Sequence, residues 1–509
     1  MSKRIVVNEG VTEVRVAVQD SGRLTELYVE RTHQRSIVGN VYKGIVINVL
    51  PGMQAAFVDV GLGKDAFLYA GDYTANLGDY ERLMLSAGGE EALEEDALEV
   101  EEVERRRVPV PIDDLLRKGQ EVLVQVSKES LGTKGARITS FISLPGRYLV
   151  YMPQADHIGV SRRIKDERER DRLRQIVREV SRAAGGGFIA RTVAEGKGRE
   201  EFASDIQFLV RLWERIQARY EQAHAPAVLH EERDLIFRVV RDLFSPEIEA
   251  FVVDSPEAYR KCLDSVSTLV PALTGRLQLY EETAPIFEAM GIEREIERAL
   301  RRRVWLKSGG YIVIDQTEAL VAIDVNTGKY IGKRDFEETV RKINLEAVGE
   351  VVRQIRLRDL GGLIIIDFID MDREEHRQQV FRALKQALAE DKARTNVLEI
   401  SELGLVEMTR KRVRQDLQSL LCTPCPHCKG SGVMKSETTL GAEIFRKVCA
   451  AVAEVGGQEI LVRVHPDLAQ YLGTAERDGI ELLQSKLGRK LSVQAVASLH
   501  RDEYEIISR

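Results

Sequence analysis

The sequence has little that would tie it to a membrane or to an oxidising compartment. It contains no run of about 18 uncharged apolar residues, and its start, MSKRIVVNEG, has no apolar stretch behind the basic residues. Cysteine is scarce, with 5 in 509 residues. Three of the five lie between positions 422 and 428, which excludes an even disulfide framework. These absences predict a cytoplasmic protein without a membrane partner.

An excess of basic residues is also lacking. Lys and Arg number 74 against 81 Asp and Glu, so the formal net charge is −7, which argues against indiscriminate coating of nucleic acid. Nine of the fifteen residues in Glu90–Glu104 are acidic, and we interpret this stretch as a solvated insertion. A helix predicted over Glu295–Arg303 ends in three arginines, which suits a helix C-terminus and could also face phosphate.

Residues 36–140 are rich in short strands and glycine turns. Five strands in this region indicate a small barrel: VGNVYKGIVINVL, GMQAAFVDV, DAFLY, EVLVQVSKE and GARITSFISL. Phe57 and Phe67 lie on consecutive strands, and Lys134 follows on a later glycine-flanked turn. Aromatic rings among basic residues on a small barrel are typical of a platform that stacks single-stranded nucleic acid. Spacing alone equally allows both rings to be ordinary core residues.

A strand–helix–strand pattern carries the chemistry. One strand ends at Asp324, a helix runs from Phe336 to about residue 360, and a buried strand ends at Asp367. Because a right-handed crossover makes such strands parallel neighbours, the two carboxylates are expected side by side, as an oxygen site suited to Mg²⁺. Asn326 would share their face and bond phosphate or water. The alternative is that these acids cap helices or anchor turns. Asp370 is a further candidate ligand, as is Asp372.

The segment CTPCPHCKGSG has the spacing and glycines of a zinc knuckle. One compact turn cannot easily wrap Cys422, Cys425, His427 and Cys428 around one ion, and the chain has no second C-x₂-C pair. We therefore expect a second protomer to supply the other ligands, so that zinc joins two subunits. A site within one chain that uses Cys422 or His427 remains the alternative.

Long stretches of the sequence resemble the ribonuclease E/G family of bacterial endoribonucleases, over essentially the whole chain. The matching stretches are NVYKGIVINVLPGMQAAFVDVGL, FISLPGRYLVYMP, GVSRRI, IART, TEALVAIDVNTG, NLEAVGEVVRQIRLRDLGGLIIIDFIDM, GLVEMTRKR and CPHCKGSG. The length is that of a short family member without a long disordered C-terminal arm. The resemblance implies a magnesium-dependent endoribonuclease that cleaves single-stranded, A/U-rich RNA, is stimulated by a 5′-monophosphate end, and acts on rRNA precursors and mRNA.

The resemblance also implies an α/β multidomain fold. An RNase H-like subdomain would comprise residues 1–35 and 236–300, interrupted by an S1-type OB-fold β-barrel at 36–140 and a 5′-end sensor region at 141–235. A DNase I-like catalytic subdomain would span 301–421, a zinc link 422–434, and a small C-terminal α/β domain 435–509. The acidic insertion lies outside the family pattern.

Site residues carry over from the family by matching positions. The barrel would stack RNA on Phe57 and Phe67 and contact phosphate through Lys134. The family's pocket for a 5′-monophosphate matches Gly146, Val150, Arg191 and Thr192. The residues AEGKG that follow Thr192 and Val193 depart from the family pattern. The magnesium ligands fall on Asp324 and Asp367 and the assisting amide on Asn326. The shared zinc falls on Cys425 and Cys428 of two protomers, which implies a homodimer that pairs into a homotetramer. Cys422 is then an extra thiol.

Two other classes of protein remain as rivals. An RNA-binding adaptor would use the barrel and do no chemistry, but it would not need the set of Asp324, Asn326 and Asp367. A zinc-organised assembly protein would depend on Cys425 and Cys428 for assembly and would not cleave RNA.

Overall fold

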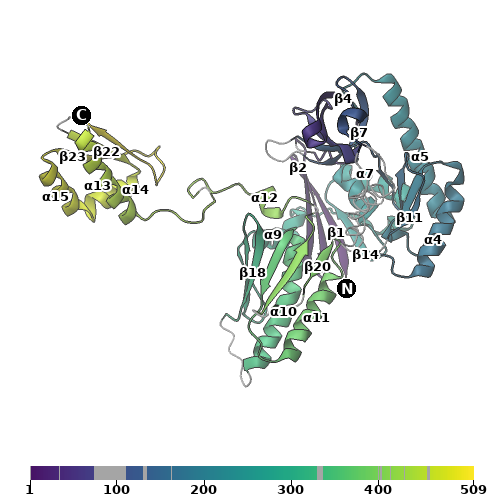
Figure 1. The fold of residues 1–509 in the computed structure, drawn as a ribbon. Coiled ribbons are helices and arrows are strands. Elements are labelled where there is room, and N and C mark those ends of the chain that lie inside the picture. Colours follow the sequence, from purple (N-terminus) through teal and green to yellow (C-terminus); the bar gives the residue numbers. More distant parts are fainter. Residues whose placement is uncertain are drawn as a thin grey trace. The chain divides into compact units, whose positions relative to one another are not determined.

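The computed structural model divides the chain into two compact units, residues 1–417 and 418–509 (Figure 1). The structure describes residues 2–33, 35–73, 110–129, 135–161, 163–328, 336–398, 401, 404–412, 414–428, 430–454 and 459–508. The acidic stretch at 90–104 and Lys134 lie outside these residues. Within the described ranges, no helix combines the length and the apolar character needed to cross a membrane.

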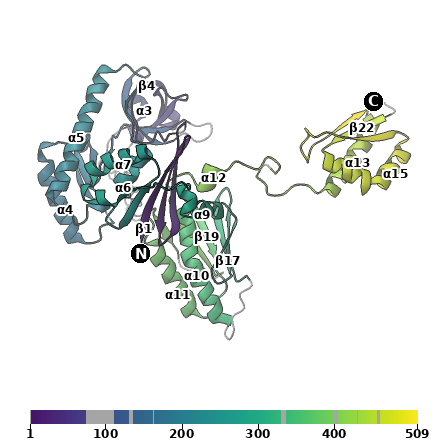
Figure 2. The same ribbon diagram turned by 180° about the vertical axis from the view of Figure 1, so that it is seen from behind.

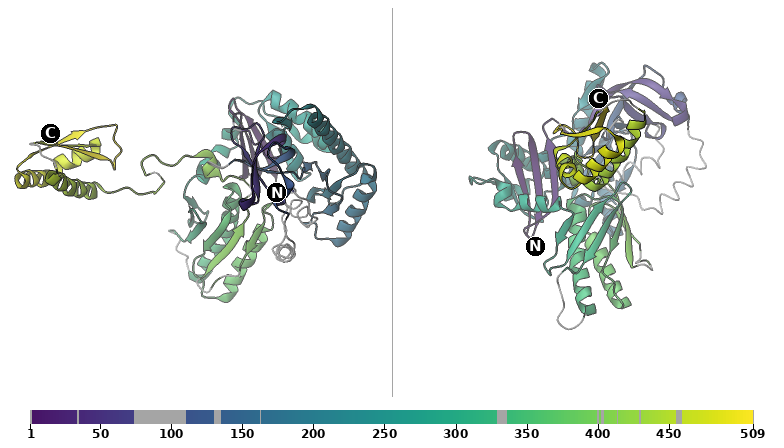
Figure 3. Two further views of the ribbon diagram at one scale, coloured as in Figure 1. Left: turned by 45° about the horizontal axis from the view of Figure 1, so that its top comes forward. Right: turned by 90° about the vertical axis from the view of Figure 1, so that its left-hand side faces the viewer.

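The N-terminal strands share a sheet with a segment much further along the chain. Its elements are β1 (Lys3–Glu9), β2 (Glu13–Asp20), β3 (Arg23–Arg31), β14 (Ile248–Val253) and β15 (Leu277–Leu279), with α6 (Leu235–Asp242), α7 (Pro256–Leu269), η5 (Pro271–Arg276), α8 (Ile286–Ala289) and α9 (Ile292–Ala299). The strand order is β15-β14-β1-β2-β3, and β1 runs parallel to β14. The purple N-terminal strands accordingly lie beside teal elements from much further along the chain (Figure 3). The helix expected to continue to Arg303 was predicted wrongly: α9 ends at Ala299, and Arg303 begins a strand.

Five strands close into a barrel that is compatible with an OB fold. They are β4 (Val41–Leu50), β5 (Ala55–Asp59), β6 (Ala66–Tyr69), β7 (Glu121–Lys128) and β8 (Arg137–Thr139), accompanied by η1 (Pro51–Met53), η2 (Ala70–Asp72), α3 (Ile112–Leu115) and β13 (Ala227–His230). Pairing of β4 with β7 closes the ring, and β13 adds to the outer side of β4. Small and branched side chains such as Ala56, Val58 and Leu68 fill the interior. The predicted barrel is therefore confirmed.

A four-stranded sheet and two charged helices follow the barrel. The elements are β9 (Leu144–Pro145), β10 (Leu149–Met152), β11 (Ile158–Val160), α4 (Glu167–Val180), η3 (Ser181–Ala183), β12 (Gly187–Ala190), η4 (Thr192–Ala194) and α5 (Arg199–Gln222). The strand order is β11-β12-β10-β9. Helix α4 buries Leu173 and Val177, and its charged residues make local pairs such as Arg172 with Glu169. These helices complete a separate core against β10 and β12.

A six-stranded sheet carries the predicted strand–helix–strand unit. Its elements are β16 (Arg303–Trp305), β17 (Tyr311–Gln316), β18 (Leu320–Asn326), α10 (Phe336–Leu357), β19 (Gly362–Asp367), α11 (Glu374–Leu388), β20 (Thr395–Val397) and β21 (Leu405–Arg410). The order is β16-β17-β18-β19-β21-β20, with β18 parallel to β19. Helices α10 and α11 pack on one face, over Ile323 and Ile364 (Figure 2). We call the opposite side, where Asp324 and Asp367 are exposed, the open face.

The second unit is a small α/β domain, as predicted. Its elements are α13 (Glu437–Glu454), β22 (Glu459–Val464), α14 (Pro466–Thr474), α15 (Arg477–Leu487), β23 (Lys490–Ala495) and β24 (Tyr504–Ser508), and α12 (Leu417–Leu421) precedes them. The central strand β22 is parallel to β23 and antiparallel to β24. Leu440, Val462 and Leu472 belong to its separate core, so this unit has its own hydrophobic interior.

Candidate active site

Two aspartates stand next to each other at the carboxyl ends of parallel strands. In the register of β18 and β19, Asp324 is opposite Asp367, one step after Ile323 opposite Ile366. Neighbouring strands lie about 4.8 Å apart, and both carboxylates are exposed on the open face. The two side chains therefore lie together, as the predicted crossover requires.

An amide joins this pair. Asn326 lies two residues after Asp324, and its Nδ2 donates a hydrogen bond of 2.7 Å to Oδ2 of that carboxylate. Burial raises the pKa of Asp367, and the negative charges of Asp324 and Asp370 raise it further. Such mutual repulsion is relieved by a cation between the carboxylates. Within the described ranges, no three Asp, Glu, His or Cys side chains gather into a metal-binding group, so a metal here would need ligands from water and substrate besides this pair.

A buried asparagine that the sequence reasoning missed holds the loop after β19. Asn344 on α10 is 0% exposed. Its Nδ2 donates to the carbonyl of Ile369 at 2.8 Å, and its Oδ1 accepts from the Ile369 amide at 3.1 Å. This clamp fixes the backbone between Asp367 and Asp370. Its only signal in the sequence is a polar residue on the apolar side of an amphipathic helix.

The two barrel phenylalanines lie outside the barrel core. Phe57 and Phe67 are direct partners across β5 and β6, with ring centroids 5.6 Å apart in an edge-to-face arrangement, and both are partly exposed. Tyr69 extends the row, 4.4 Å from Phe67, and the Arg137 guanidinium lies 4.7 Å from the Tyr69 centroid. The outward position removes the reason for treating the rings as ordinary core residues.

Lys43 of β4 is a barrel lysine whose contacts lie within the fold. Lys43 is buried, and its Nζ donates to the carbonyl oxygens of Tyr220 and Ala223 at 3.2 and 3.0 Å. It also pairs with Glu121 at 3.0 Å, so its charge is used within the fold. Lys134 lies outside the described residues.

Arg191 occupies a polar corner beside the end of β12. Its Nη1 donates to the Gly146 carbonyl at 2.8 Å and to Oδ1 of Asp242 at 2.7 Å. The guanidinium carries further donors on Nη2 and Nε. The hydroxyl of Thr192 lies 3.1 Å from the hydroxyl of Ser161. The structure therefore brings Gly146, Arg191 and Thr192 into one corner.

Val150 is placed differently from the other three residues of this set. It is 1% exposed and belongs to a small apolar cluster with Met152, Ala155 and Ile189. Its side chain packs within this cluster, so it cannot contact a ligand in the corner directly.

A buried carboxylate shapes the turn that leads into β10. Asp205 on α5 accepts hydrogen bonds from the backbone amides of Arg147, Tyr148 and Leu149 at 2.8–3.0 Å. Burial raises its pKa, while these bonds oppose the rise. A Cβ on Gly146 would lie 2.6 Å from this carboxylate, so only glycine fits there.

Asp242 is the second acidic residue that sequence reasoning missed in this corner. It bonds Arg191 and both Nε and Nη2 of Arg241. Burial opposes its ionisation, but the charges of Arg241 and Arg191 outweigh burial and hold its pKa well below the usual range. Neither Asp205 nor Asp242 stands in a local pattern with Arg191, so no signal in the sequence links them.

The cysteine turn presents thiols surrounded by backbone amides. Cys425 is exposed, and Cys428 is partly exposed. The backbone amides of Gly432 and Gly430 lower the pKa of the Cys428 thiol, and Cys425 lowers it further. Both glycines have positive φ, 74° and 94°, which lets the turn direct its amides at sulfur. This environment favours a thiolate, the form that binds zinc. Cys422 is exposed at the end of α12.

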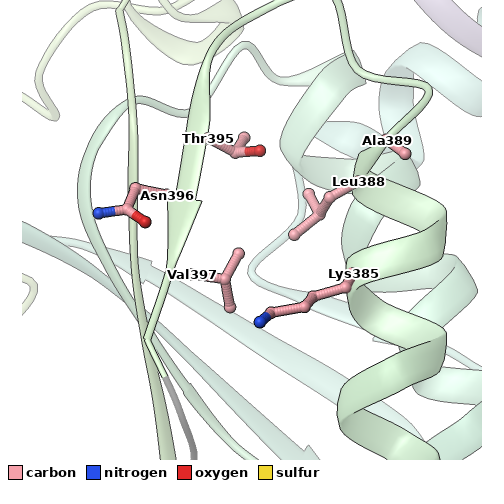
Figure 4. Close-up of a pocket in the computed structure, with 6 residues that line it drawn as sticks. All are labelled: Lys385, Leu388, Ala389, Thr395, Asn396 and Val397. Atoms are coloured by element: carbon pink, nitrogen blue, oxygen red, sulfur yellow. The ribbon is translucent and has the colours of Figure 1, made fainter. Parts of the chain in front are cut away.

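A hollow of about 340 Å³ lies away from all of these residues, between the end of α11 and β20 (Figure 4). It is lined by Lys385, Leu388, Ala389, Thr395, Asn396 and Val397. The Lys385 ammonium lies 4.5 Å from the centroid of Phe381, so its charge already has a partner. The acidic pair therefore does not lie in this hollow. It lies at the exposed carboxyl ends of two central strands, and this position suits a polymer better than an enclosed small molecule.

Comparison with known proteins gives one consistent family. The Ribonuclease E/G family profile matches residues 143–413, and a profile described as the RNase E/G thioredoxin-like domain matches residues 424–509. Ribonuclease G of Escherichia coli K12 is 42% identical over 507 residues, with 100% of both chains covered. Ribonuclease G of Haemophilus influenzae is 39% identical over 505 residues, with 99% of both covered. Ribonuclease E of E. coli K12 is 36% identical over 487 residues, which are 95% of this chain and 44% of that protein. The chain belongs to the ribonuclease E/G family.

Proposed function

We propose that the protein is a magnesium-dependent endoribonuclease that cleaves single-stranded, A/U-rich RNA and is stimulated by a 5′-monophosphate end. The observation that carries the proposal is the pairing of Asp324 with Asp367 at the ends of parallel strands, with Asn326 bonded to the first. Membership of a family of endoribonucleases supports RNA as the substrate. We further propose that it acts in the cytoplasm on rRNA precursors and mRNA.

The acidic pair fits Mg²⁺ in particular. Mg²⁺ is bound by one or two carboxylates and completes its shell with waters and substrate phosphate, and the open face offers two exposed carboxylates. When bound there, Mg²⁺ supplies charge neutralisation and activation of water. Asp324 and Asp367 would hold the ion. The Asn326 amide keeps the Asp324 carboxylate oriented and is placed to bond the phosphate or the attacking water.

The reaction is hydrolysis of a phosphodiester. Water attacks phosphorus, the bond from phosphorus to the 3′ oxygen breaks, and that oxygen takes up a proton. The products carry a 5′-phosphate and a 3′-hydroxyl. Because the acidic pair lies at exposed strand ends, a single RNA strand can reach it without an enclosing cavity.

Incubation of the purified protein with a 5′-monophosphorylated, A/U-rich single-stranded RNA tests the proposal directly. With Mg²⁺ we expect internal cuts whose downstream products begin with a 5′-phosphate, and with EDTA we expect none. Binding of the RNA with no cuts under either condition would instead make the protein an adaptor without chemistry.

The barrel supplies the RNA-binding part of the proposal. Phe57 and Phe67 form an outward pair that suits base stacking, and Lys134 is proposed as a phosphate contact. We also propose RNase H-like and DNase I-like subdomains around this barrel, an S1-type role for it, and a homodimer, pairing into a homotetramer, held by zinc at Cys425 and Cys428.

The corner around Arg191 is proposed to hold the 5′-monophosphate, with Thr192 and Gly146 beside it and Val150 in its apolar cluster. Replacement of Arg191 by Ala is expected to lower the ratio of cleavage rates on 5′-monophosphorylated and 5′-hydroxylated RNA by about 10-fold, because a charged hydrogen bond to phosphate is lost. Asp242 keeps its two bonds from Arg241, so the corner retains a paired carboxylate. The measurement is the ratio of cleavage rates on the two RNAs.

Arg199→Ala is the matched control. Arg199 is an exposed arginine whose partner is Glu179 at 3.2 Å, and its loss should leave the ratio unchanged. An unchanged ratio in Arg191→Ala as well would mean that the 5′ end is bound elsewhere.

A further inference from the structure

An exposed tryptophan stands on the edge strand of the catalytic sheet. Trp305 is 55% exposed, and it is one of two tryptophans in the chain. Its neighbour Val304 points the other way and is buried in the core of the sheet. The strand is thus anchored by Val304, and the indole is not needed to fill the interior. More than half of a large aromatic surface faces outward, and tryptophan is a residue type that is enriched at binding surfaces.

Two further side chains join the tryptophan. Tyr311 is its direct partner across β16 and β17, with ring centroids 5.2 Å apart at 62°. The guanidinium of Arg303 lies 4.4 Å from the Tyr311 centroid and 5.9 Å from the Trp305 centroid. We call these three residues the aromatic edge. It combines two rings with one cation on an exposed strand.

The aromatic edge is continuous with the acidic pair. Tyr311 is the direct partner of Asn326 across β17 and β18, as Trp305 is of Tyr311. Direct partners in antiparallel strands point to the same side of a sheet. Trp305, Tyr311 and Asn326 therefore form a row on the open face, next to Asp324. Two strand spacings put Trp305 about 10 Å from the strand that carries Asp324.

The exposed cation and the two rings of the aromatic edge favour a ligand that carries both phosphates and flat bases. Arg303 is exposed, and the nearby carboxylate of Asp315 is paired with Arg302 at 2.6 Å. Single-stranded RNA offers unpaired bases that stack on aromatic rings and phosphates that pair with guanidinium. A duplex cannot offer its bases in this way.

We propose that Arg303, Trp305 and Tyr311 form a stacking subsite for one base of single-stranded RNA close to the scissile phosphate, with Arg303 facing the backbone phosphate. The inference deepens the proposed function and rests on it, because it takes the acidic pair as the cleavage site. The subsite aligns the strand across the sheet edge and favours unpaired RNA there. It is distinct from the barrel rings, which lie on another sheet.

Cleavage kinetics test the subsite. In Trp305→Ala we expect KM for single-stranded RNA to rise about 10-fold, because a stacking contact is lost, with kcat changed much less. Trp305→Phe keeps a ring and should restore most of the affinity. Leu482→Ala removes an exposed apolar side chain from the other unit and should change nothing. An abasic nucleotide moved through positions near the cut should raise KM at one position in the wild type, and raise it no further in Trp305→Ala. Unchanged KM in Trp305→Ala, with normal cleavage by the wild type, overturns the subsite and leaves the proposed function standing.

Fluorescence provides a reading that does not depend on cleavage. Trp213→Phe leaves Trp305 as the single tryptophan. Uncleaved single-stranded RNA, added in EDTA, should quench its emission and protect it from iodide, and duplex RNA of the same sequence should do so far less. Protection that instead rises with protein concentration in the absence of RNA would mean that a second copy of the chain covers Trp305, and would overturn the proposal. Absence of cleavage by the wild type, with quenching retained, would reject the nuclease function and leave a stacking site.

Discussion

Asp324→Asn is expected to lower RNA cleavage by about 10³-fold while RNA binding is retained. The substitution removes one of the two carboxylates proposed to hold the cation. A bound metal supplies several kcal/mol of charge stabilisation at the transition state, and about 1.4 kcal/mol corresponds to a tenfold change in rate. Asparagine has the same shape and keeps an oxygen that can accept the hydrogen bond from Asn326, so the strand end should stay in place. The measurement is single-turnover cleavage of a labelled RNA at saturating protein.

Asp315→Asn is the matched control for this prediction. Asp315 lies on β17 of the same sheet, and its carboxylate is partly exposed and paired with Arg302. Loss of an exposed pair has little effect on stability, so cleavage should remain near the wild-type rate. Asp367→Asn should resemble Asp324→Asn, and the double variant should be little worse than either, because residues that act as one unit are not additive. Near-normal cleavage by Asp324→Asn would exclude the ends of β18 and β19 as the metal site.

The pairing of the two candidate aspartates could be predicted because topology alone determines it. A right-handed crossover between two short strands makes them parallel neighbours, and side chains at their carboxyl ends then meet. The register confirms this for Asp324 and Asp367. The barrel was predictable for a similar reason, since five strands of the right length separated by glycine turns have few ways to bury one face each.

The corner around Arg191 could not be predicted in the same way. Its geometry depends on Asp205 and Asp242, which come from two different helices and reach the corner only through tertiary packing. Strand and helix periodicity report which side chains are buried, but they do not report which buried polar groups will meet. The place of Gly146 follows from Asp205, because a side chain there would collide with that carboxylate.

The run of arginines that leads into β16 caused the wrong prediction of a helix over Glu295–Arg303. A run of basic residues after an apolar-periodic segment is typical of a helix end, yet α9 ends at Ala299 and the run leads into a strand. The alternation of exposed Arg303, buried Val304 and exposed Trp305 is the strand signal. Three residues are too few for that period to outweigh the helical pattern before them.

Replacing both Cys425 and Cys428 by Ser is expected to abolish the proposed zinc-linked dimer. Two thiolates from each of two chains complete the tetrahedral shell of a structural zinc, and two from a single chain fill only half of it. Apparent binding free energies for structural zinc are on the order of 10–16 kcal/mol. Loss of the zinc should therefore destabilise the dimer by more than the remaining contacts between the chains stabilise it. The lowered pKa of Cys428 supports a thiolate at this turn. The zinc content measured by metal analysis should fall from one zinc per two chains to none. The sedimentation coefficient should fall from that of the assembled species to that of the monomer.

Cys422→Ser separates the shared site from a site within one chain. Cys422 is exposed just before the turn, and under the shared arrangement its loss should change neither the zinc content nor the sedimentation coefficient. A content of one zinc per chain that falls in Cys422→Ser would instead place the metal within a single chain. The shared arrangement binds one zinc per two chains, whereas the single-chain arrangement binds one zinc per chain, so the ratio of zinc to protein decides between them even before any variant is made.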